Sequence, residues 1–227
     1  TTFWGTEQNE NLLLDVYLPT NDSQDSRPLI IFLYGGSFIS GSKESPDIVE
    51  LCMRYAKMGY VTSAINYRLT PTLIFEGTEE NAYKAVMKGI HDLKAAVRYF
   101  RMDDEMNNSY GVDTERVYAG GVSAGAITAV NGAYLDLESE IPPLVFDYVM
   151  NETGGIEGES GNEGYDSSFH GIINLCGAIG DVAWIEEGDL PIVSMHGDQD
   201  DVIPYDENLV TLFGLDIIVD GSYIIHQ

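Results

Sequence analysis

The segment Tyr118–Gly125 constrains the fold of this chain more than any other. It reads Tyr-Ala-Gly-Gly-Val-Ser-Ala-Gly, a short apolar strand that ends in Gly-x-Ser-x-Gly and runs into small residues of helical type, Ala126–Val130. A serine on such a strand-to-helix turn adopts a tight backbone conformation that exposes its Oγ, and the flanking glycines leave room for it. The segment therefore predicts an exposed serine, Ser123, in a protein that combines strands with helices.

The surroundings of Ser123 decide between a nucleophile and a plain glycine-rich turn. Asp113–Arg116 has the composition of a turn before the strand, and a helix is expected after it. The first N–H groups of that helix and the positive end of its dipole would point at the serine, where they could hold a developing negative charge. This context favours a serine nucleophile.

Apolar runs and helical patterns alternate along the chain. Leu29–Tyr34 is unbroken and apolar, which is typical of a strand covered on both faces. We expect strands at 12–17, 29–34, 60–66, 118–122, 171–176 and 191–195, and helices at 48–58 and 81–101. This alternation predicts one α/β domain over residues 1–227, with a mostly parallel central sheet and helices on both faces.

One segment departs from this rhythm. Asn151–Ser168 combines five glycines with five acidic residues, so it can bury little and is predicted to be an excursion from the core. A mobile surface loop, a lid over a substrate cleft and a weak calcium site are the three interpretations that the sequence leaves open.

The charge balance excludes several classes of partner. The chain has 11 Lys and Arg against 37 Asp and Glu, a net charge of −26, so nucleic acid and anionic membranes are poor partners. No apolar run approaches the ~20 residues of a membrane span. Cys52 and Cys176 form no disulfide framework, and Cys176 is expected to be a buried thiol in a strand. The acidity and the absence of an initiator Met favour a secreted or periplasmic protein. No cofactor or metal is predicted.

Two further strand ends carry residues suited to acyl transfer. Active sites of open α/β sheets lie at the carboxyl ends of the strands. Gly35, Gly36 and Ser37 follow the 29–34 strand, and their amides, with that of Ala124, are the predicted oxyanion donors. Each donor is worth roughly 10²–10³-fold in rate.

The third strand end is acidic. Residues 196–204 read His-Gly-Asp-Gln-Asp-Asp-Val-Ile-Pro, and a carboxylate there could orient a histidine. The alternative is a calcium loop starting at Asp198, but an EF-hand needs glycine at its sixth position, where this chain has Ile203.

These motifs together resemble the α/β-hydrolase superfamily in its carboxylesterase and lipase branch. The matching stretches follow the family's order and cover most of the chain: 12–19, 34–38, 66–69, 121–125 and 196–205. The resemblance implies Ser123 as nucleophile and Asp200 as the acid that orients a histidine, with Asp198 and Asp201 as its rivals. Tyr34 stands where the family's oxyanion motif has histidine. Because the oxyanion donors are backbone groups, this departure should be tolerated.

The general base is harder to assign. His91 lies in a predicted helix, His170 precedes a strand, and His196 matches a position that is not catalytic in the family. His226 comes in the expected order, but 221–227 looks like the start of a helix. The resemblance implies a further strand and a histidine loop beyond Gln227, and loss of a last strand would leave an open sheet edge that could pair two copies.

The sequence thus predicts a serine hydrolase of small or short-chain carboxylic esters. Two other hypotheses stay open: a non-catalytic module with the hydrolase fold, and a peptidase of the prolyl-oligopeptidase type.

Overall fold

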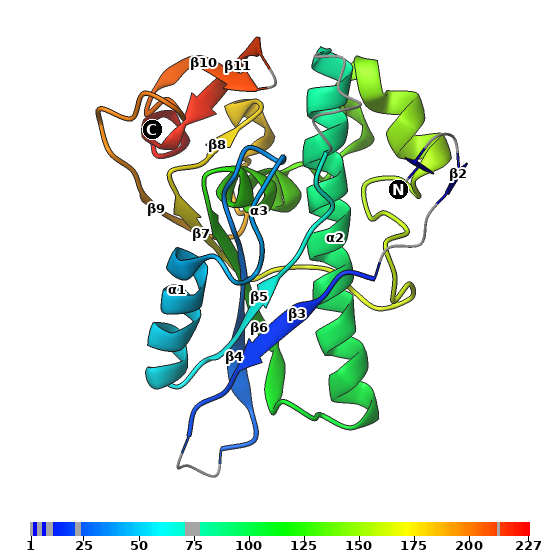
Figure 1. Cartoon of the computed structure of the whole chain (residues 1–227), viewed down its shortest axis with the longest axis vertical. Coiled ribbons are helices and arrows are strands. Elements are labelled where there is room, and N and C mark those ends of the chain that lie inside the picture. Colours follow the sequence, from blue (N-terminus) through cyan, green and yellow to red (C-terminus); the bar gives the residue numbers. More distant parts are fainter. Residues whose placement is uncertain (1, 4–5, 8–10, 21–23, 71–77, 213) are drawn as a thin grey trace.

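A six-stranded sheet forms the centre of the molecule (Figure 1). The computed structural model describes residues 2–3, 6–7, 11–20, 24–70, 78–212 and 214–227. The strand order is β3-β5-β4-β6-β7-β9, in which β3 pairs antiparallel and all other neighbours are parallel. The strands span Leu14–Tyr17 (β3), Arg27–Leu33 (β4), Val61–Ile65 (β5), Val112–Val122 (β6), Ile172–Leu175 (β7) and Ile192–Met195 (β9).

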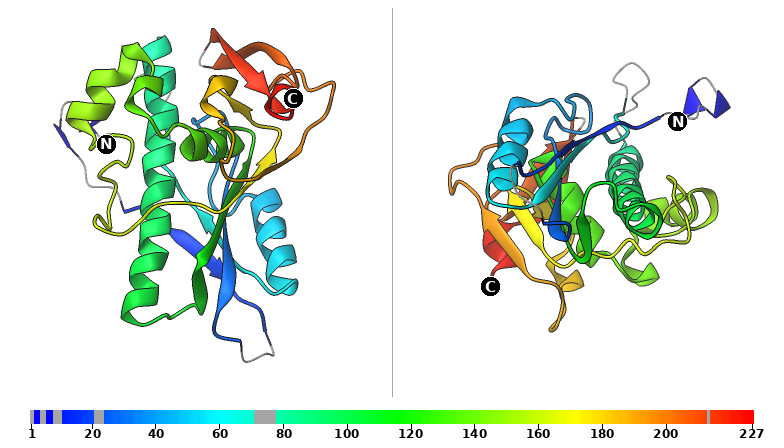
Figure 2. Two further views of the ribbon diagram at one scale, coloured as in Figure 1. Left: turned by 180° about the vertical axis from the view of Figure 1, so that it is seen from behind. Right: turned by 90° about the horizontal axis from the view of Figure 1, so that it is seen from below.

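Helices cover both faces of this sheet. In Figure 2, α1 lies on one face and α2 with α3 on the other. The α-helices are Pro46–Lys57 (α1), Glu79–Met106 (α2), Ala124–Tyr134 (α3) and Ser222–Ile225 (α4). Short 3₁₀ turns occur at Glu138–Glu140, Pro143–Val145 and Val182–Trp184, and a π-helical turn at Tyr148–Glu152. The predicted α/β fold with a mostly parallel sheet is confirmed.

Local sequence explains most of these boundaries. Leu29, Ile31, Phe32 and Leu33 are fully buried, as expected for a central strand packed on both faces. Helix α1 begins with proline in its first turn and ends just before Gly59, which has a positive φ of 102°. Thr78 caps α2 by accepting a hydrogen bond from the amide of Asn81, at 3.2 Å.

A second, smaller sheet lies above the carboxyl ends of the central strands. It consists of a hairpin, β10 (Glu207–Leu212) and β11 (Leu215–Gly221), whose second strand pairs antiparallel with β8 (Ala178–Ile179). Strands β1 (Thr2–Phe3) and β2 (Thr6–Glu7) pair antiparallel and form a separate two-stranded ribbon. The β10–β11 hairpin is not among the predicted strands, although Gly214 between two apolar runs is a turn signal.

Two predicted boundaries need correction. Asp113–Arg116, expected to be a turn, belongs to β6, but the pairing with β4 jumps from Asp113 to Val117, so the intervening residues form a bulge. An ion pair of 2.6 Å between Arg116 and Asp113 closes that bulge. The helix expected at 81–101 extends to Met106.

Candidate active site

Ser123 lies at the junction of β6 and α3, where the backbone is strained. Its φ of 54° and ψ of −119° belong to a region that residues with a Cβ rarely adopt. Its amide donates to the carbonyl of Leu175, at 3.0 Å, and its carbonyl accepts from the amide of Ile127, at 2.9 Å. The residue is half-buried, and in the described chain its hydroxyl has no hydrogen-bond partner. The side chain is therefore available to a ligand.

The two glycines of the motif are required by close backbone contacts. A Cβ on Gly121 would lie 2.4 Å from the carbonyl carbon of Gly125, and a Cβ on Gly125 would lie 2.2 Å from the carbonyl oxygen of Leu33. Any side chain at either position would separate α3 from the strands beneath it. The glycines thus hold the start of α3, and with it Ser123, directly against the sheet.

The turn after β4 lies beside Ser123, as predicted. A Cβ on Gly35 would come within 3.2 Å of the Ser123 Cβ. Three consecutive residues of this turn have positive φ: Gly36 at 124°, Ser37 at 54° and Phe38 at 60°. Within the described residues, the amides of Ser37 and Ala124 donate no hydrogen bond. The structure therefore brings the residues predicted to surround an oxyanion to one place.

Tyr34 braces this turn from the interior. Its ring stacks on that of Tyr67 with centroids 4.4 Å apart, and the Tyr67 hydroxyl donates to the Tyr34 carbonyl at 2.9 Å. The added Cβ of an alanine at Gly41 would lie 2.4 Å from the Tyr34 ring. Both tyrosines are buried. Burial raises the pKa of the Tyr67 hydroxyl well above its usual range. Tyr34 thus replaces the histidine of the related motif with a packed, neutral pair.

Asp200 is the acid of the loop after β9 whose carboxylate accepts backbone hydrogen bonds. Its Oδ1 accepts the amides of Val202 and Ile203, at 2.8 and 3.0 Å. It is half-buried, whereas Asp198 and Asp201 are exposed. These contacts single out Asp200 among the three acids.

Two histidines belong to a polar network beside this loop. The side chain of His196 is buried. Its Nδ1 hydrogen-bonds with Ser222 Oγ at 2.7 Å. Its Nε2 lies 3.0 Å from the Ile203 carbonyl oxygen and 3.6 Å from Asp200 Oδ2. His226 hydrogen-bonds Ser194 Oγ through Nε2, at 2.9 Å. The structure therefore occupies His226 with Ser194 and does not bring it to Ser123.

The other two histidines lie away from Ser123. His170 accepts the amide of Val117 through Nδ1, at 3.1 Å, within β6 and before its carboxyl end. His91 is buried in α2, and burial lowers its pKa to about 4. In the described chain, none of the four histidines contacts the Ser123 hydroxyl.

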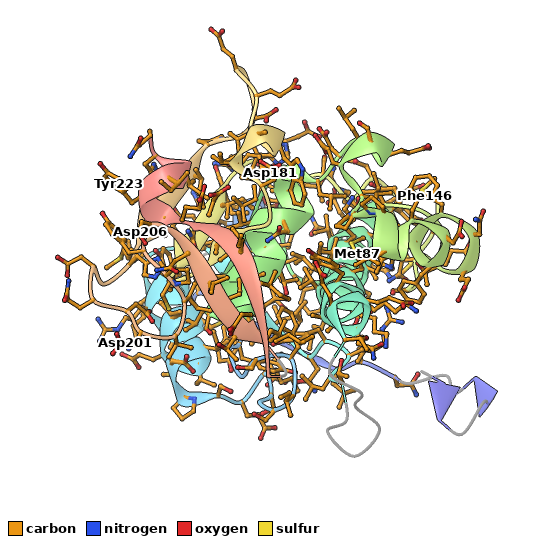
Figure 3. The ribbon with its side chains drawn as sticks, turned by 90° about the horizontal axis from the view of Figure 1, so that it is seen from above. Met87, Phe146, Asp181, Asp201, Asp206 and Tyr223 are labelled. Atoms are coloured by element: carbon orange, nitrogen blue, oxygen red, sulfur yellow. The ribbon has the colours of Figure 1, made fainter. Side chains whose placement is uncertain are left out.

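Ser123 opens on a large apolar cleft. The cleft has a volume of about 910 Å³ out to its open mouth and runs between α2, α3 and the β10–β11 hairpin. In Figure 3 the hairpin crosses above α3, between Asp206 at its base and the helix that carries Met87. The side chains of the cleft come from Ser37, Phe38, Ser123 and Ala124 at one end, and from Tyr83, Val86, Met87, Ile127, Asn131, Trp184, Val210, Leu212, Ile217 and Val219 along its walls.

The acidic segment 151–168 contributes no side chain to this cleft. Basic residues of α2 hold it instead: Lys94 pairs with Glu157 at 2.7 Å, Arg101 pairs with Asp166 at 3.1 Å, and Arg98 donates to three of its carbonyls. Burial opposes ionisation of Glu157, but the hydrogen bond and charge of Lys94 outweigh it and hold the pKa of Glu157 below its usual value. The five glycines of segment 151–168 all have positive φ. The segment is an anchored excursion, and the lid interpretation gains no support.

Both cysteines are free thiols. Cys176, predicted to be buried within a strand, follows β7 and is half-exposed with a φ of 50°. Burial still raises the pKa of its thiol. Among the described residues, no group of three or more histidine, cysteine or acidic side chains is placed to hold a metal ion.

Comparison with protein families decides where this fold belongs. The model of the BD-FAE family matches residues 14–158, which is more than half of the chain. The chain belongs to the BD-FAE family. This family places it among the carboxylesterase-type α/β-hydrolases, in agreement with the predicted resemblance.

Individual relatives of this BD-FAE chain are esterases and lipases by name. It is 30% identical over 127 residues to Lipase 1 of Geotrichum candidum, which covers 54% of the chain and 22% of that lipase. It is 31% identical over 116 residues to arylacetamide deacetylase of Oryctolagus cuniculus, covering 51% of the chain and 26% of that protein. The chain thus spans about a quarter of the length of these curated relatives.

A solved structure supports the fold over a longer stretch. The propionate-bound esterase Est2 of Thermogutta terrifontis superimposes with a TM-score of 0.63, covering 87% of this BD-FAE chain and 71% of the esterase, at 21% identity. Among the described residues, no helix is long and apolar enough to cross a membrane.

Proposed function

We propose that this protein hydrolyses carboxylic esters through an acyl-enzyme formed on Ser123. The observation that carries the proposal is the Ser123 turn itself. A strained, half-buried serine with an unpartnered hydroxyl lines an apolar cleft, beside amides that donate to no described group. Exposure and nearby N–H donors are the two properties that a serine nucleophile requires.

In the proposed reaction, Ser123 Oγ attacks the ester carbonyl carbon. The carbonyl π electrons move to oxygen, and the amides of Ser37 and Ala124 donate to that oxyanion, with Gly36 in the same turn. The C–O bond to the alcohol then breaks, and the alcohol leaves with the proton taken from Ser123. Water attacks the acyl-enzyme in the same way and releases the carboxylic acid.

A general base must accept the Ser123 proton, and Asp200 is the proposed residue that orients it. Asp200 Oδ1 is held by two backbone amides, which fixes the carboxylate. Among the described residues none of the four histidines hydrogen-bonds to Ser123, so we assign the base to none of them.

The proposed substrates are esters. The names of the related lipases and esterases support this class, and the propionate-bound and butyrate-bound structures of Est2 support our proposal of small or short-chain esters.

The test is hydrolysis of p-nitrophenyl butyrate by the intact protein. Replacing Ser123 by alanine should reduce kcat/KM by at least 10³-fold, because the covalent route is removed. The matched control is Ser139→Ala, an exposed serine that does not line the cleft, which should match the wild type. Equal turnover by Ser123→Ala and wild type would reject the proposal.

One observation favours a second candidate, a non-catalytic module with the hydrolase fold. This is the lack of contact between Ser123 and any described histidine. A fluorophosphonate probe separates the two, because it labels a serine only where that serine is activated. A parallel panel of aminoacyl amides and esters tests the peptidase hypothesis, which predicts faster amide cleavage.

A further inference from the structure

The cleft beside Ser123 has an unusual lining for so acidic a chain. Among the described residues that line it, none is Asp, Glu, Lys, Arg or His, although the chain has 37 acidic and 11 basic residues. Burying an unpaired charge or a strongly polar group costs several kcal/mol. An occupant of this cleft must therefore be uncharged and largely apolar.

The few polar side chains along its walls already have partners. Asn131 donates to the carbonyls of Ile127 and Ala178, at 2.7 and 3.0 Å, and accepts from the amide of Gly180, at 2.9 Å. The Tyr83 hydroxyl donates to Glu79 at 2.9 Å, and the Thr211 hydroxyl donates to Asp216 at 2.7 Å. The donors of these three side chains are therefore already engaged within the protein.

One whole wall of the cleft is the inner face of the β10–β11 hairpin. Val210 pairs with Ile217 across the two strands, so both side chains lie on the same face, and both line the cleft. Val210 is only 6% exposed. Leu209, the next residue of the same strand, is 50% exposed and lines no part of the cleft. Val210 therefore faces the cleft and Leu209 does not, although Thr211 and Ile218, on the same face of the hairpin as Leu209, also border the cleft.

The base of the hairpin is fixed to the rest of the molecule. Asp220 Oδ2 accepts the amide of Val182 at 2.8 Å, and Asp220 pairs with Ile179 of β8. At the next residue, Gly221, an added Cβ would lie 2.0 Å from the Pro204 carbonyl oxygen, so the backbones are in direct contact. These contacts favour a fixed wall over a lid that swings away.

We infer that the inner face of the β10–β11 hairpin is the specificity wall of this site, and that Val210 with Ile217 limits the length of the group that enters. The occupant is the alkyl part of an uncharged ester. This inference rests on the proposed function for its choice of ligand. It goes beyond that function by naming the residues that select the substrate.

A binding experiment tests the wall without relying on catalysis. In the Ser123→Ala background, methyl acetate, butanoate, hexanoate and octanoate are titrated while tryptophan fluorescence is recorded, because Trp184 lines the cleft. Kd should fall about fourfold per added methylene, the equivalent of ~0.8 kcal/mol for burying one CH₂.

The variants form a matched set on one strand. Val210→Phe should weaken octanoate binding at least tenfold and leave acetate binding unchanged, because the larger ring shortens the cleft. Val210→Ala should keep the fall in Kd with each added methylene, and this result would also show that the site still folds. Leu209→Phe, on the outer face, should stay within twofold of the parent for every ester.

The outcomes separate this inference from the proposed function. A Kd that does not change with acyl chain length would overturn the inference about the hairpin. Equal losses of octanoate affinity in Val210→Phe and Leu209→Phe would overturn it as well. Unchanged ester turnover in Ser123→Ala would overturn the proposed function, while the binding series would still decide the role of the hairpin.

Discussion

The two glycines of helix α3 should respond in opposite ways to the same substitution. In a helix interior, Gly→Ala normally stabilises by about 0.8–1 kcal/mol, because alanine loses less backbone entropy on folding. At Gly132 an added Cβ would lie 3.5 Å from Ile90 and 3.9 Å from Leu93, which is ordinary van der Waals contact. Gly132→Ala should therefore raise the free energy of unfolding by up to about 1 kcal/mol.

At Gly125 the same methyl group meets backbone. It would lie 2.2 Å from the Leu33 carbonyl oxygen and 2.7 Å from that of Tyr34, and neither atom belongs to a side chain that can rotate away. Overpacking of this kind typically costs 1–3 kcal/mol. Gly125→Ala should therefore lower the free energy of unfolding by about that amount, despite the better helix propensity of alanine.

Urea unfolding of the two variants and the wild type measures the difference. We expect the variants to differ by about 2–4 kcal/mol, which for a chain of this size corresponds to roughly 4–16 °C in Tm. If both substitutions shift the midpoint in the same direction and by similar amounts, α3 does not rest on the β4 backbone and the account of the Ser123 turn is wrong.

Three other predictions address charge and assembly. Asp92 is fully buried and pairs with Arg68 at 2.8 Å, so Asp92→Asn should destabilise by about 3–5 kcal/mol in chemical denaturation, and a loss below 1 kcal/mol would contradict the pairing. Because burial lowers the pKa of His91 from 6.5 to about 4, the folded state binds fewer protons than the unfolded state, and stability should fall as pH drops below 6.5. Unfolding midpoints should show a loss of roughly 2–3 kcal/mol by pH 4.5 that His91→Phe abolishes, whereas parallel pH profiles would refute this cause. Finally, β9 is an edge strand among the described strands, and Met195 on it is 72% exposed, so we propose that this edge pairs two copies of the chain. Sedimentation should show a dimer that Met195→Lys converts to a monomer. An unchanged mass in that variant would contradict the proposal.

The sequence predicted the central sheet well because each of its signals is local. Apolar runs such as Leu29–Leu33 are typical of strands covered on both faces. Gly59, just after α1, has a positive φ, which glycine adopts easily and which ends a helix. The proximity of Gly35 to Ser123 could also be predicted, because the carboxyl ends of neighbouring parallel strands meet at one edge of the sheet.

What the sequence did not predict depends on contacts between distant segments. The β10–β11 hairpin has a visible turn signal at Gly214, but its position over the cleft depends on Asp220 meeting the amide of Val182. Likewise, the glycines and acids of 151–168 indicated a loose loop, because the chain order does not reveal that Lys94 and Arg98 of α2 lie beneath it. The composition of 151–168 gives its flexibility and charge but not its partners, because those partners lie more than 50 residues away in the sequence.

The assignment of Ser123 is tested most directly by mapping the site of a fluorophosphonate adduct by peptide mass spectrometry on the intact protein. The account predicts a single adduct on the peptide that contains Ser123, which disappears in Ser123→Ala and persists in Ser139→Ala. An adduct on another residue, or no adduct under conditions that label a known serine esterase, would contradict it.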